Sequence, residues 1–349
     1  MALATSADAE RVQRERVCAP LGAEEHTSAV SLGDSAIRRF ASVRGVSVRH
    51  KLRQSPGEVA IPANCTNPQM KLTLPRDLLA SLLQPSARPS QTVAISAQAR
   101  SESLRRAAIE ALAHWGHLRC TELARVLWPE AKYPEQLCQR LMRKLMTAGL
   151  VLARSNAVGT RSFVLTRPGA ALAEALGVKA RHGLDLASVS GATFIHRSIA
   201  NRYGIERQLQ GATSYGEYAM ALAATPINRD LLNRQFGKLP DLMIIQDGLD
   251  WVEVESSAKS KSELQRCLAI AKHCGGMFTG PNVTLNRVIF VCDNRLNHEQ
   301  RIRKAALELW ANLTERERAK LSARVSLVQV VLGPCSKWLS MTEPTPLKL

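Results

Sequence analysis

Apolar residues recur at regular spacing only after about residue 100. Residues 1–100 hold no sustained apolar period and are rich in Ser, Ala, Arg, Pro and Gly, which predicts a disordered region and linker. Over residues 101–180, the spacing predicts three short helices followed by a β-hairpin. Over residues 190–335, helices alternate with strands, which predicts an α/β fold with a mixed sheet flanked by helices. Residues 336–349 are expected to form a frayed tail.

The third helix of the first region has the most informative pattern. Pro134 is placed to begin this helix and Gly149 to end it. Leu137, Leu141 and Leu145 repeat every four residues and predict its buried stripe. Three helices followed by a hairpin is the order of a winged helix-turn-helix, a class of module whose third helix enters the major groove of DNA.

Most polar residues of the third helix lie off the predicted apolar stripe. They are Gln136, Gln139, Arg140, Arg143 and Lys144. Glutamine pairs with adenine edges, arginine with guanine edges and lysine with phosphates, so this face predicts contact with double-stranded DNA. Arg154 and Arg161, on the hairpin strands, are expected to reach the adjacent DNA backbone. The alternative is a solvated basic face on an ordinary three-helix unit.

The charge of the whole chain favours the same kind of partner. It holds 47 Lys and Arg against 30 Asp and Glu, a formal net charge of +17, and more than half of this surplus lies in residues 70–185. Such a surplus predicts a polyanionic partner, first nucleic acid and second an acidic membrane surface. The chain has no long apolar run and no signal-peptide pattern, so we expect a cytoplasmic protein without a membrane segment. Met70 begins a segment that reads like a second start, which leaves open whether residues 1–69 belong to the natural protein.

Three acidic residues of the second region are expected to lie together. Asp241 opens one predicted strand, and Glu253 and Glu255 lie on the same face of the next strand, after a tight turn. Clustered carboxylates repel one another unless they are protonated or bridged by a cation, and such oxygen ligands suit Mg²⁺ or Mn²⁺. A metal ion held there would activate water for phosphodiester hydrolysis. Lys259 and Lys261, at the start of the next helix, are expected to approach the same end of the sheet.

The acidic residues also carry a resemblance to a known fold. Pro240-Asp241 followed by Glu253-x-Glu255 resembles the PD-(D/E)xK nuclease pattern. With the predicted winged helix before it, the chain resembles the bacterial replication-relaxation family of plasmids and integrative elements over residues 100–300. The further segments that carry this resemblance are LTRPGAALAEAL, HRSIANRYGIE and PDLMI…WVEVESS.

The resemblance implies a set of roles. Asp241 and Glu253 would bind Mg²⁺ or Mn²⁺ if the site is active, and Glu206, on the helix before the sheet, would be an extra ligand. The protein would act on double-stranded DNA in replication control or conjugative mobilisation, together with a relaxase or another mobilisation protein.

One position departs from the nuclease pattern. Glu255 stands where these nucleases have a lysine that stabilises charge and positions the attacking water. An anion there acts against cleavage of a phosphate, so Lys259 or Lys261 would have to supply the cation, or catalysis has been lost.

Three functions therefore stay open. The favoured one is a non-catalytic DNA-binding protein of a mobile element. The second is a metal-dependent endonuclease or nickase that uses Asp241, Glu253, Glu255 and Lys261. The third is a transcriptional repressor whose second region mediates formation of a homodimer.

Overall fold

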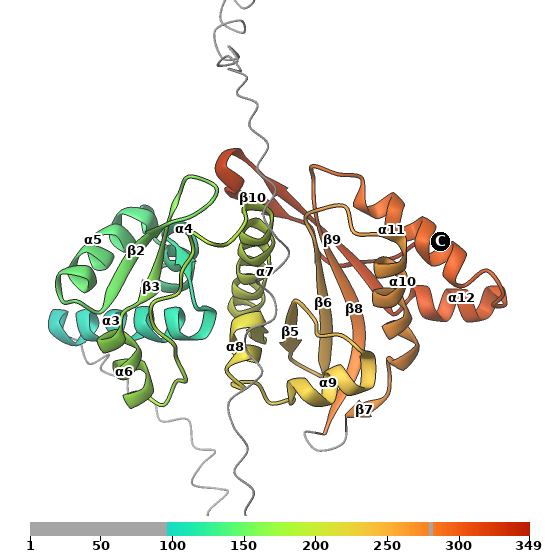
Figure 1. Cartoon of the computed structure of the whole chain (residues 1–349), viewed down its shortest axis with the longest axis horizontal. Coiled ribbons are helices and arrows are strands. Elements are labelled where there is room, and N and C mark those ends of the chain that lie inside the picture. Colours follow the sequence, from blue (N-terminus) through green and yellow to red (C-terminus); the bar gives the residue numbers. More distant parts are fainter. Residues whose placement is uncertain (1–95, 279–281) are drawn as a thin grey trace, which may run out of the picture. The chain divides into compact units, whose positions relative to one another are not determined.

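In the computed structural model, the segments with regular apolar spacing form helices and strands (Figure 1). These elements follow one another in two regions, each with its own sheet. The structure describes residues 96–278 and 282–349, so the prediction for the N-terminal region lies outside the described residues up to 95. The fold class predicted for the rest of the chain is confirmed at the level of a mixed α/β structure with a mixed sheet and flanking helices.

The first region contains four helices and a small antiparallel sheet of order β1-β3-β2. Its elements are α3 (Ala97–Trp115), β1 (Leu118–Arg119), α4 (Cys120–Leu127), α5 (Pro134–Thr147), β2 (Val151–Ser155), β3 (Arg161–Leu165) and α6 (Arg167–Ala175). Pro134 occupies the first position of α5, where its missing N–H costs nothing. Gly149 has a φ of +69°, which lets the chain leave α5 and enter β2.

The buried stripe of α5 is not the one that the leucine repeat predicts. Its buried residues are Cys138, Met142 and Leu145, whereas Leu137 and Leu141 are only half-buried. The prediction is confirmed for Leu145 and wrong for Leu137 and Leu141, since Cys138 and Met142 take the core positions one residue further along.

The second region is built on a larger sheet of order β10-β9-β8-β6-β5-β4. Its helices are α7 (Gly191–Leu209), α8 (Glu217–Ala221), α9 (Arg229–Phe236), α10 (Lys261–Ala269), α11 (His298–Leu309) and α12 (Glu315–Ser322). Its strands are β4 (Thr213–Gly216), β5 (Leu242–Ile245), β6 (Leu249–Glu255), β7 (Met277–Phe278), β8 (Val283–Asp293), β9 (Val325–Leu332), β10 (Trp338–Met341) and β11 (Thr345–Pro346). Short 3₁₀ turns cover Ile270–His273 and Pro334–Ser336.

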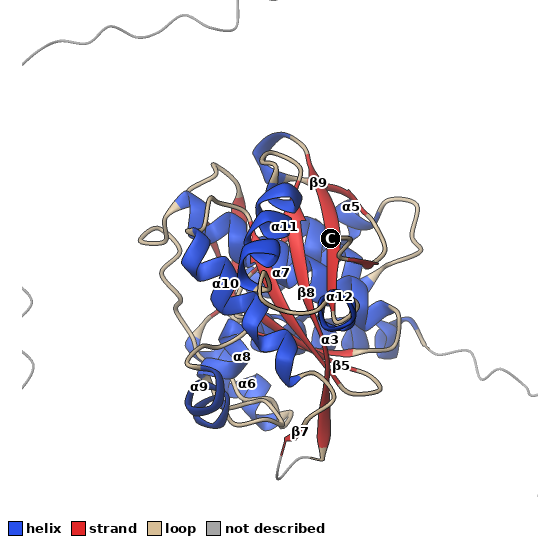
Figure 2. Cartoon of the chain, turned by 90° about the vertical axis from the view of Figure 1, so that its right-hand side faces the viewer, coloured by secondary structure: helices blue, strands red, loops and turns tan. Residues whose placement is uncertain are grey.

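Strand direction in this sheet changes at β6. Strand β5 is antiparallel to both of its neighbours, β4 and β6, whereas β6, β8 and β9 are parallel to one another. Helices α10 and α11 lie over one face of the sheet, and α7 lies over the other (Figure 1, Figure 2). Side chains of β5 and β6 alternate between these faces, with Val252 on the side of α7 and Trp251 on the side of α10.

The end of the chain is ordered into the sheet, so the tail predicted for residues 336–349 is wrong. Strands β10 and β11 both pair with β9, and Leu347 is buried. Strand β10 forms a hairpin with β9, and β11 returns to the first half of β9. The short, proline-containing end gives no apolar period that would predict these two strands.

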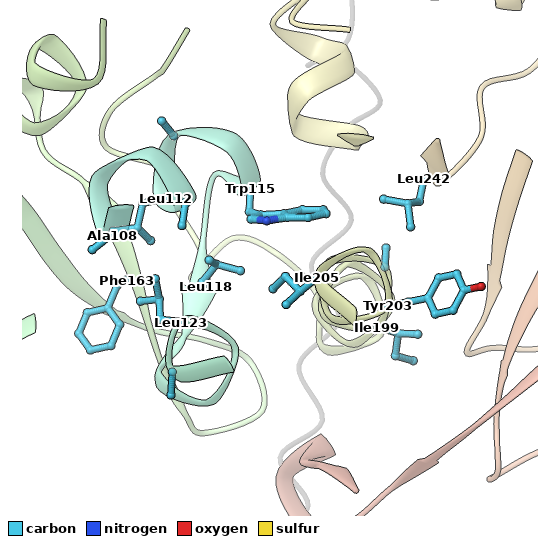
Figure 3. Packing of buried hydrophobic residues seen from close by; sticks show 14 of the residues in the cluster. Ala108, Leu112, Trp115, Leu118, Leu123, Phe163, Ile199, Tyr203, Ile205 and Leu242 are labelled. Carbon is cyan, nitrogen blue, oxygen red and sulfur yellow. The ribbon is translucent and has the colours of Figure 1, made fainter. Parts of the chain in front are cut away.

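One hydrophobic core runs through both regions. Trp115, at the end of α3, reaches toward α7 and is 2% exposed (Figure 3). A methyl group placed on Gly204 of α7 would lie 2.3 Å from Cη2 of this ring, and one on Gly216 would lie 3.3 Å from Cζ3. The two glycines therefore form a notch for Trp115, and the described residues belong to a single compact unit.

The notch yields the first prediction. We expect Gly204→Ala to lower the free energy of unfolding by about 2 kcal/mol, because the indole ring must move to admit the methyl group. This loss should appear although alanine favours a helix interior by about 1 kcal/mol. Gly191→Ala, in the same helix, is the matched control, since its added methyl group would meet nothing closer than 3.8 Å. Urea unfolding measures both variants, and equal stabilities would contradict the notch.

Candidate functional site

Three carboxylates meet at the C-terminal end of β6. Asp241 precedes β5, donates its backbone N–H to the carbonyl of Val252 and accepts the N–H of Val254 at Oδ2, at 2.8 Å. Glu253 and Glu255 lie on one face of β6, and both side chains are fully buried. The structure thus brings together the three acids that the sequence pattern placed at this edge.

Lys259 joins the three acids. Its Nζ lies 2.8 Å from Oε1 of Glu255, 3.3 Å from Oε2 of Glu253 and 3.9 Å from Oδ2 of Asp241. The residue lies in the segment between β6 and α10, and Arg301 of α11 donates a hydrogen bond to its backbone carbonyl. The ammonium group is therefore held at the centre of the acids by both its side chain and its backbone.

Lys261, the other lysine expected here, does not reach the acids. It is the first residue of α10, and its Nζ pairs with Oε2 of Glu308 on α11 at 2.9 Å. Its side chain is 63% exposed, whereas that of Lys259 is 20% exposed. The assignment of Lys261 to the site is therefore corrected to Lys259, because the first turn of α10 directs residue 261 outward.

A second lysine, which the sequence analysis did not select, completes the cluster. Lys238 follows α9, and its Nζ pairs with Oε2 of Glu253 and lies 3.2 Å from Sγ of Cys267. The indole N–H of Trp251 donates to Oε1 of Glu253 at 2.7 Å. Both oxygens of Glu253 are thus occupied. The available signal was a lysine three residues before Asp241, and nothing in the sequence shows which way it turns.

Helix α7 contributes a histidine rather than the predicted acid. Nε2 of His196 lies 3.2 Å from Oδ1 of Asp241. Glu206 instead pairs with Arg125 of α4 at 3.0 Å and with Arg202 of α7 at 2.7 Å. It lies almost three turns further along α7, so it is not a member of this cluster.

The cluster balances its own charge. Burial alone would raise the pKa of Asp241, but the hydrogen bond and charge of His196, together with Lys259, lower it to about 2. Burial opposes the charged form of Lys259, yet Glu253, Asp241 and Glu255 raise its pKa, and Glu253 does the same for Lys238. The pKa of His196 is raised by Asp241 against the effect of burial.

Glu255 is the least satisfied member. Burial raises its pKa, and Lys259 opposes this only in part. Its ion pair with Lys259 is short, but neither oxygen makes a hydrogen bond of good geometry within the described residues.

The carboxylate oxygens of Glu253 and Asp241 already have partners in the observed arrangement. The oxygens that Mg²⁺ or Mn²⁺ would need on Glu253 accept hydrogen bonds from Trp251 and Lys238, and those of Asp241 from His196 and Val254. Across residues 96–278 and 282–349, no three His, Cys, Asp or Glu side chains are grouped as ligands. Metal binding by Asp241 and Glu253 stays a prediction, and it would require the lysines to move.

A second candidate surface lies on α5. The polar residues predicted for contact with DNA are all exposed, namely Gln136, Gln139, Arg140, Arg143 and Lys144. Their spacing of three and four residues places them on one face of the helix. The cations of this face, Arg140, Arg143 and Lys144, form no ion pair with any described residue.

The hairpin adds two further cations. Arg154 of β2 and Arg161 of β3 are both exposed. In the strand register, Arg154 lies opposite Ser162, and Arg161 lies opposite Ser155. Residues opposite one another share a face and successive residues alternate, so the two arginine side chains project from opposite faces of the hairpin. Because they project from opposite faces, only one of the two arginines can extend the polar face of α5 on a given side of the hairpin.

Comparison with known proteins identifies no relative of the chain. No protein-family model matches the chain, and a search of curated proteins returns no significant match. Within the described residues, no helix combines the length and apolar character needed to cross a membrane.

The lysine cluster predicts unequal roles for Lys259 and Lys261. We expect Lys259→Met to lower the free energy of unfolding by about 3 kcal/mol, because it leaves buried carboxylates without their cation. Lys261→Met should change it by less than about 0.5 kcal/mol, since its pair with Glu308 is exposed. Urea unfolding at neutral pH measures both substitutions. If Lys261→Met lowered the free energy of unfolding as much as Lys259→Met does, the assignment of Lys259 as the cation of the buried acids would be contradicted.

The lowered pKa of Asp241 predicts a pH dependence of stability. A carboxyl group whose pKa is lower in the folded state stabilises the fold above its unfolded pKa, and this contribution is lost as pH falls toward the folded value of about 2. We therefore expect Asp241→Asn to cost up to about 2 kcal/mol at pH 7 and progressively less below pH 4. Asp247→Asn, an exposed turn position, is the control. Urea unfolding across this pH range would contradict the assignment if the cost of Asp241→Asn stayed constant.

Proposed function

We propose that the chain binds double-stranded DNA through α5 and the β2–β3 hairpin. The order α3-β1-α4-α5-β2-β3 and the sheet order β1-β3-β2 support this proposal, because they are typical of a winged helix-turn-helix. In such a module α5 is the helix that enters the major groove.

The observation that carries the proposal is the unpaired polar face of α5. This helix has three cations and a single acid, Glu135. Its two glutamines and two arginines are the side chains that recognise adenine and guanine edges in the major groove, and Lys144 suits a phosphate.

We further propose that the second region is a nuclease-like fold used without catalysis. Helix α7, the antiparallel strands β4, β5 and β6, and the parallel connection from β6 through α10 to β8 support a PD-(D/E)xK-like topology. By resemblance, the chain would act in replication control or conjugative mobilisation of a plasmid or integrative element. A relaxase partner rests on this resemblance alone.

The endonuclease alternative has weaker support. Lys259 supplies an ammonium group to the three acids, as a phosphate-cleaving site requires. Against this, Lys238 and Trp251 occupy the oxygens of Glu253, and Glu255 adds a buried negative charge. The repressor alternative requires a second copy of the chain, and its mark would be a palindromic site bound by a dimer.

Replacing the arginines of α5 tests the DNA-binding proposal. We expect the double variant Arg140→Ala/Arg143→Ala to weaken duplex binding by about 2 kcal/mol or more, roughly 30-fold. The slope of log affinity against log salt should fall by up to about 2, because up to two phosphate-bound counterions are no longer displaced. Fluorescence anisotropy over a salt series, with DNA duplexes taken from the sequence around the gene that encodes the chain, measures both quantities.

A matched variant separates this role from loss of total charge. Arg229→Ala/Arg234→Ala removes the same charge from exposed positions of α9 and should change affinity only slightly. Equal weakening by both double variants would overturn the assignment to α5. Supercoiled plasmid incubated with Mn²⁺ tests the endonuclease alternative, since nicking that Asp241→Asn abolishes would favour it.

A further inference from the structure

Two cysteines lie between α4 and α5, the helix pair that bears the polar face of α5. Cys120 is the first residue of α4, and its Sγ lies 3.4 Å from the backbone carbonyl oxygen of Glu135 on α5. Cys138 follows Glu135 by three residues, so it lies on the same face of α5, nearly one turn further along. The thiol of Cys138 hydrogen-bonds to that of Cys120, and both side chains pack in the core that the two helices share. The two sulfur atoms are therefore neighbours across the helix pair.

The two thiols differ in access and in acidity. Cys120 is half-buried, whereas Cys138 is fully buried. The hydrogen bond from Cys138 lowers the pKa of Cys120, although burial and the charges of Glu135 and Glu122 act against it. Burial instead raises the pKa of Cys267 to about 12. A partly exposed thiol with a lowered pKa beside a second cysteine is the arrangement of a reactive thiol and its resolving partner.

We propose that Cys120 and Cys138 form a reversible disulfide when the chain meets a hydroperoxide such as hydrogen peroxide. The thiolate of Cys120 attacks one peroxide oxygen and becomes a sulfenic acid, and the departing hydroxide takes up a proton to give water. The sulfur of Cys138 then attacks the sulfenic sulfur, its thiol proton goes to the departing hydroxide, and a second water forms. Together the two thiols lose two protons and two electrons, which reduce the peroxide to water.

Closing this disulfide changes the position of α5. A disulfide holds its sulfur atoms about 2.05 Å apart, which is closer than two unbonded thiols approach. Gln139 and Arg140 directly follow Cys138 in α5, and both are exposed on its polar face. Side chains that read a partner must be held to within about 0.5 Å, so drawing Cys138 toward α4 displaces them from their places. Oxidation therefore weakens duplex binding, a consequence that rests on the proposed DNA binding, whereas the disulfide itself does not.

Mass spectrometry of tryptic peptides tests the disulfide on the full chain. Trypsin releases Cys120 in the peptide CTELAR and Cys138 in the peptide YPEQLCQR, and each peptide holds a single cysteine. After treatment with hydrogen peroxide and blocking of free thiols, these peptides should appear as one linked species that dithiothreitol separates. Absence of this species overturns the proposal.

Three variants make the linkage test specific. Cys120→Ser should abolish the linked species, and Cys138→Ala should leave a sulfenic acid at residue 120 that dimedone traps. Cys335→Ser, at an exposed position in the turn Pro334–Ser336, is the matched control and should leave the linked species unchanged. Trapping of a sulfenic acid at Cys335 but not at residue 120 would overturn the assignment of Cys120 as the reactive thiol.

Fluorescence anisotropy with the same duplexes tests the effect on α5. The oxidised chain should bind about fivefold more weakly than the reduced chain, and dithiothreitol should restore the affinity. Peroxide should leave the affinity of Cys120→Ser unchanged. A linked peptide without a change in affinity would overturn regulation of α5 by the disulfide. If the reduced chain does not bind DNA at all, the proposed function fails, whereas the linked peptide still reports whether the disulfide forms.

Discussion

The second region depends on compensating the acids of its central strand. Every residue of β6 from Leu249 to Glu255 is buried, and three of the seven are acidic. An unpaired carboxylate in such a place would cost several kcal/mol, so each one requires a cation from a neighbouring element. Arg287 of β8 pairs with Asp250 at 2.9 Å, and Lys238 and Lys259 pair with the glutamates. The segment before β5, through Lys238, and the segment after β6, through Lys259, are thereby both fixed to β6.

This compensation also decides what the end of β6 can do. Two ammonium groups and one histidine face three carboxylates, so the cluster is neutral when His196 is protonated. The positive charge that a divalent metal would bring is thus already present in the chain. A cluster neutralised by its own lysines stabilises the fold without a bound ion, and it offers a phosphate less positive charge than a metal site would.

The convergence of the acids could be predicted from sequence because it follows from local rules. The Asp247-Gly248 turn fixes the register of β5 against β6, and alternation then sets the face of Glu253 and Glu255. Which lysine enters the cluster could not be predicted, since residues 259 and 261 differ only in the rotation at the start of α10.

The positions missed at the sequence level share a physical cause. Lys238 lies in an irregular segment, and the contacts that turn it toward Glu253 come from elements distant in sequence. The exposed polar residues of α5 could be predicted one by one, although Cys138 and Met142, rather than Leu137 and Leu141, complete the buried stripe with Leu145. The polar face of a helix is wider than its apolar stripe, so exposed residues can be predicted correctly even when the predicted stripe is off by one position. Buried residues cannot, because each core position is filled by one particular side chain.

The shared core ties the two candidate surfaces together. Trp115 ends α3 and packs into the notch in α7 and β4, while Arg125 of α4 pairs with Glu206 of α7. Helix α5 packs on α4, so the orientation of its polar face is set by contacts that continue into the large sheet. A cavity of about 440 Å³ lies at this same junction and is lined by Trp115 and by Asp241 of the acidic cluster. The packing of Trp115 in its notch therefore connects the sheet that holds the acids to the helices that position the polar face of α5.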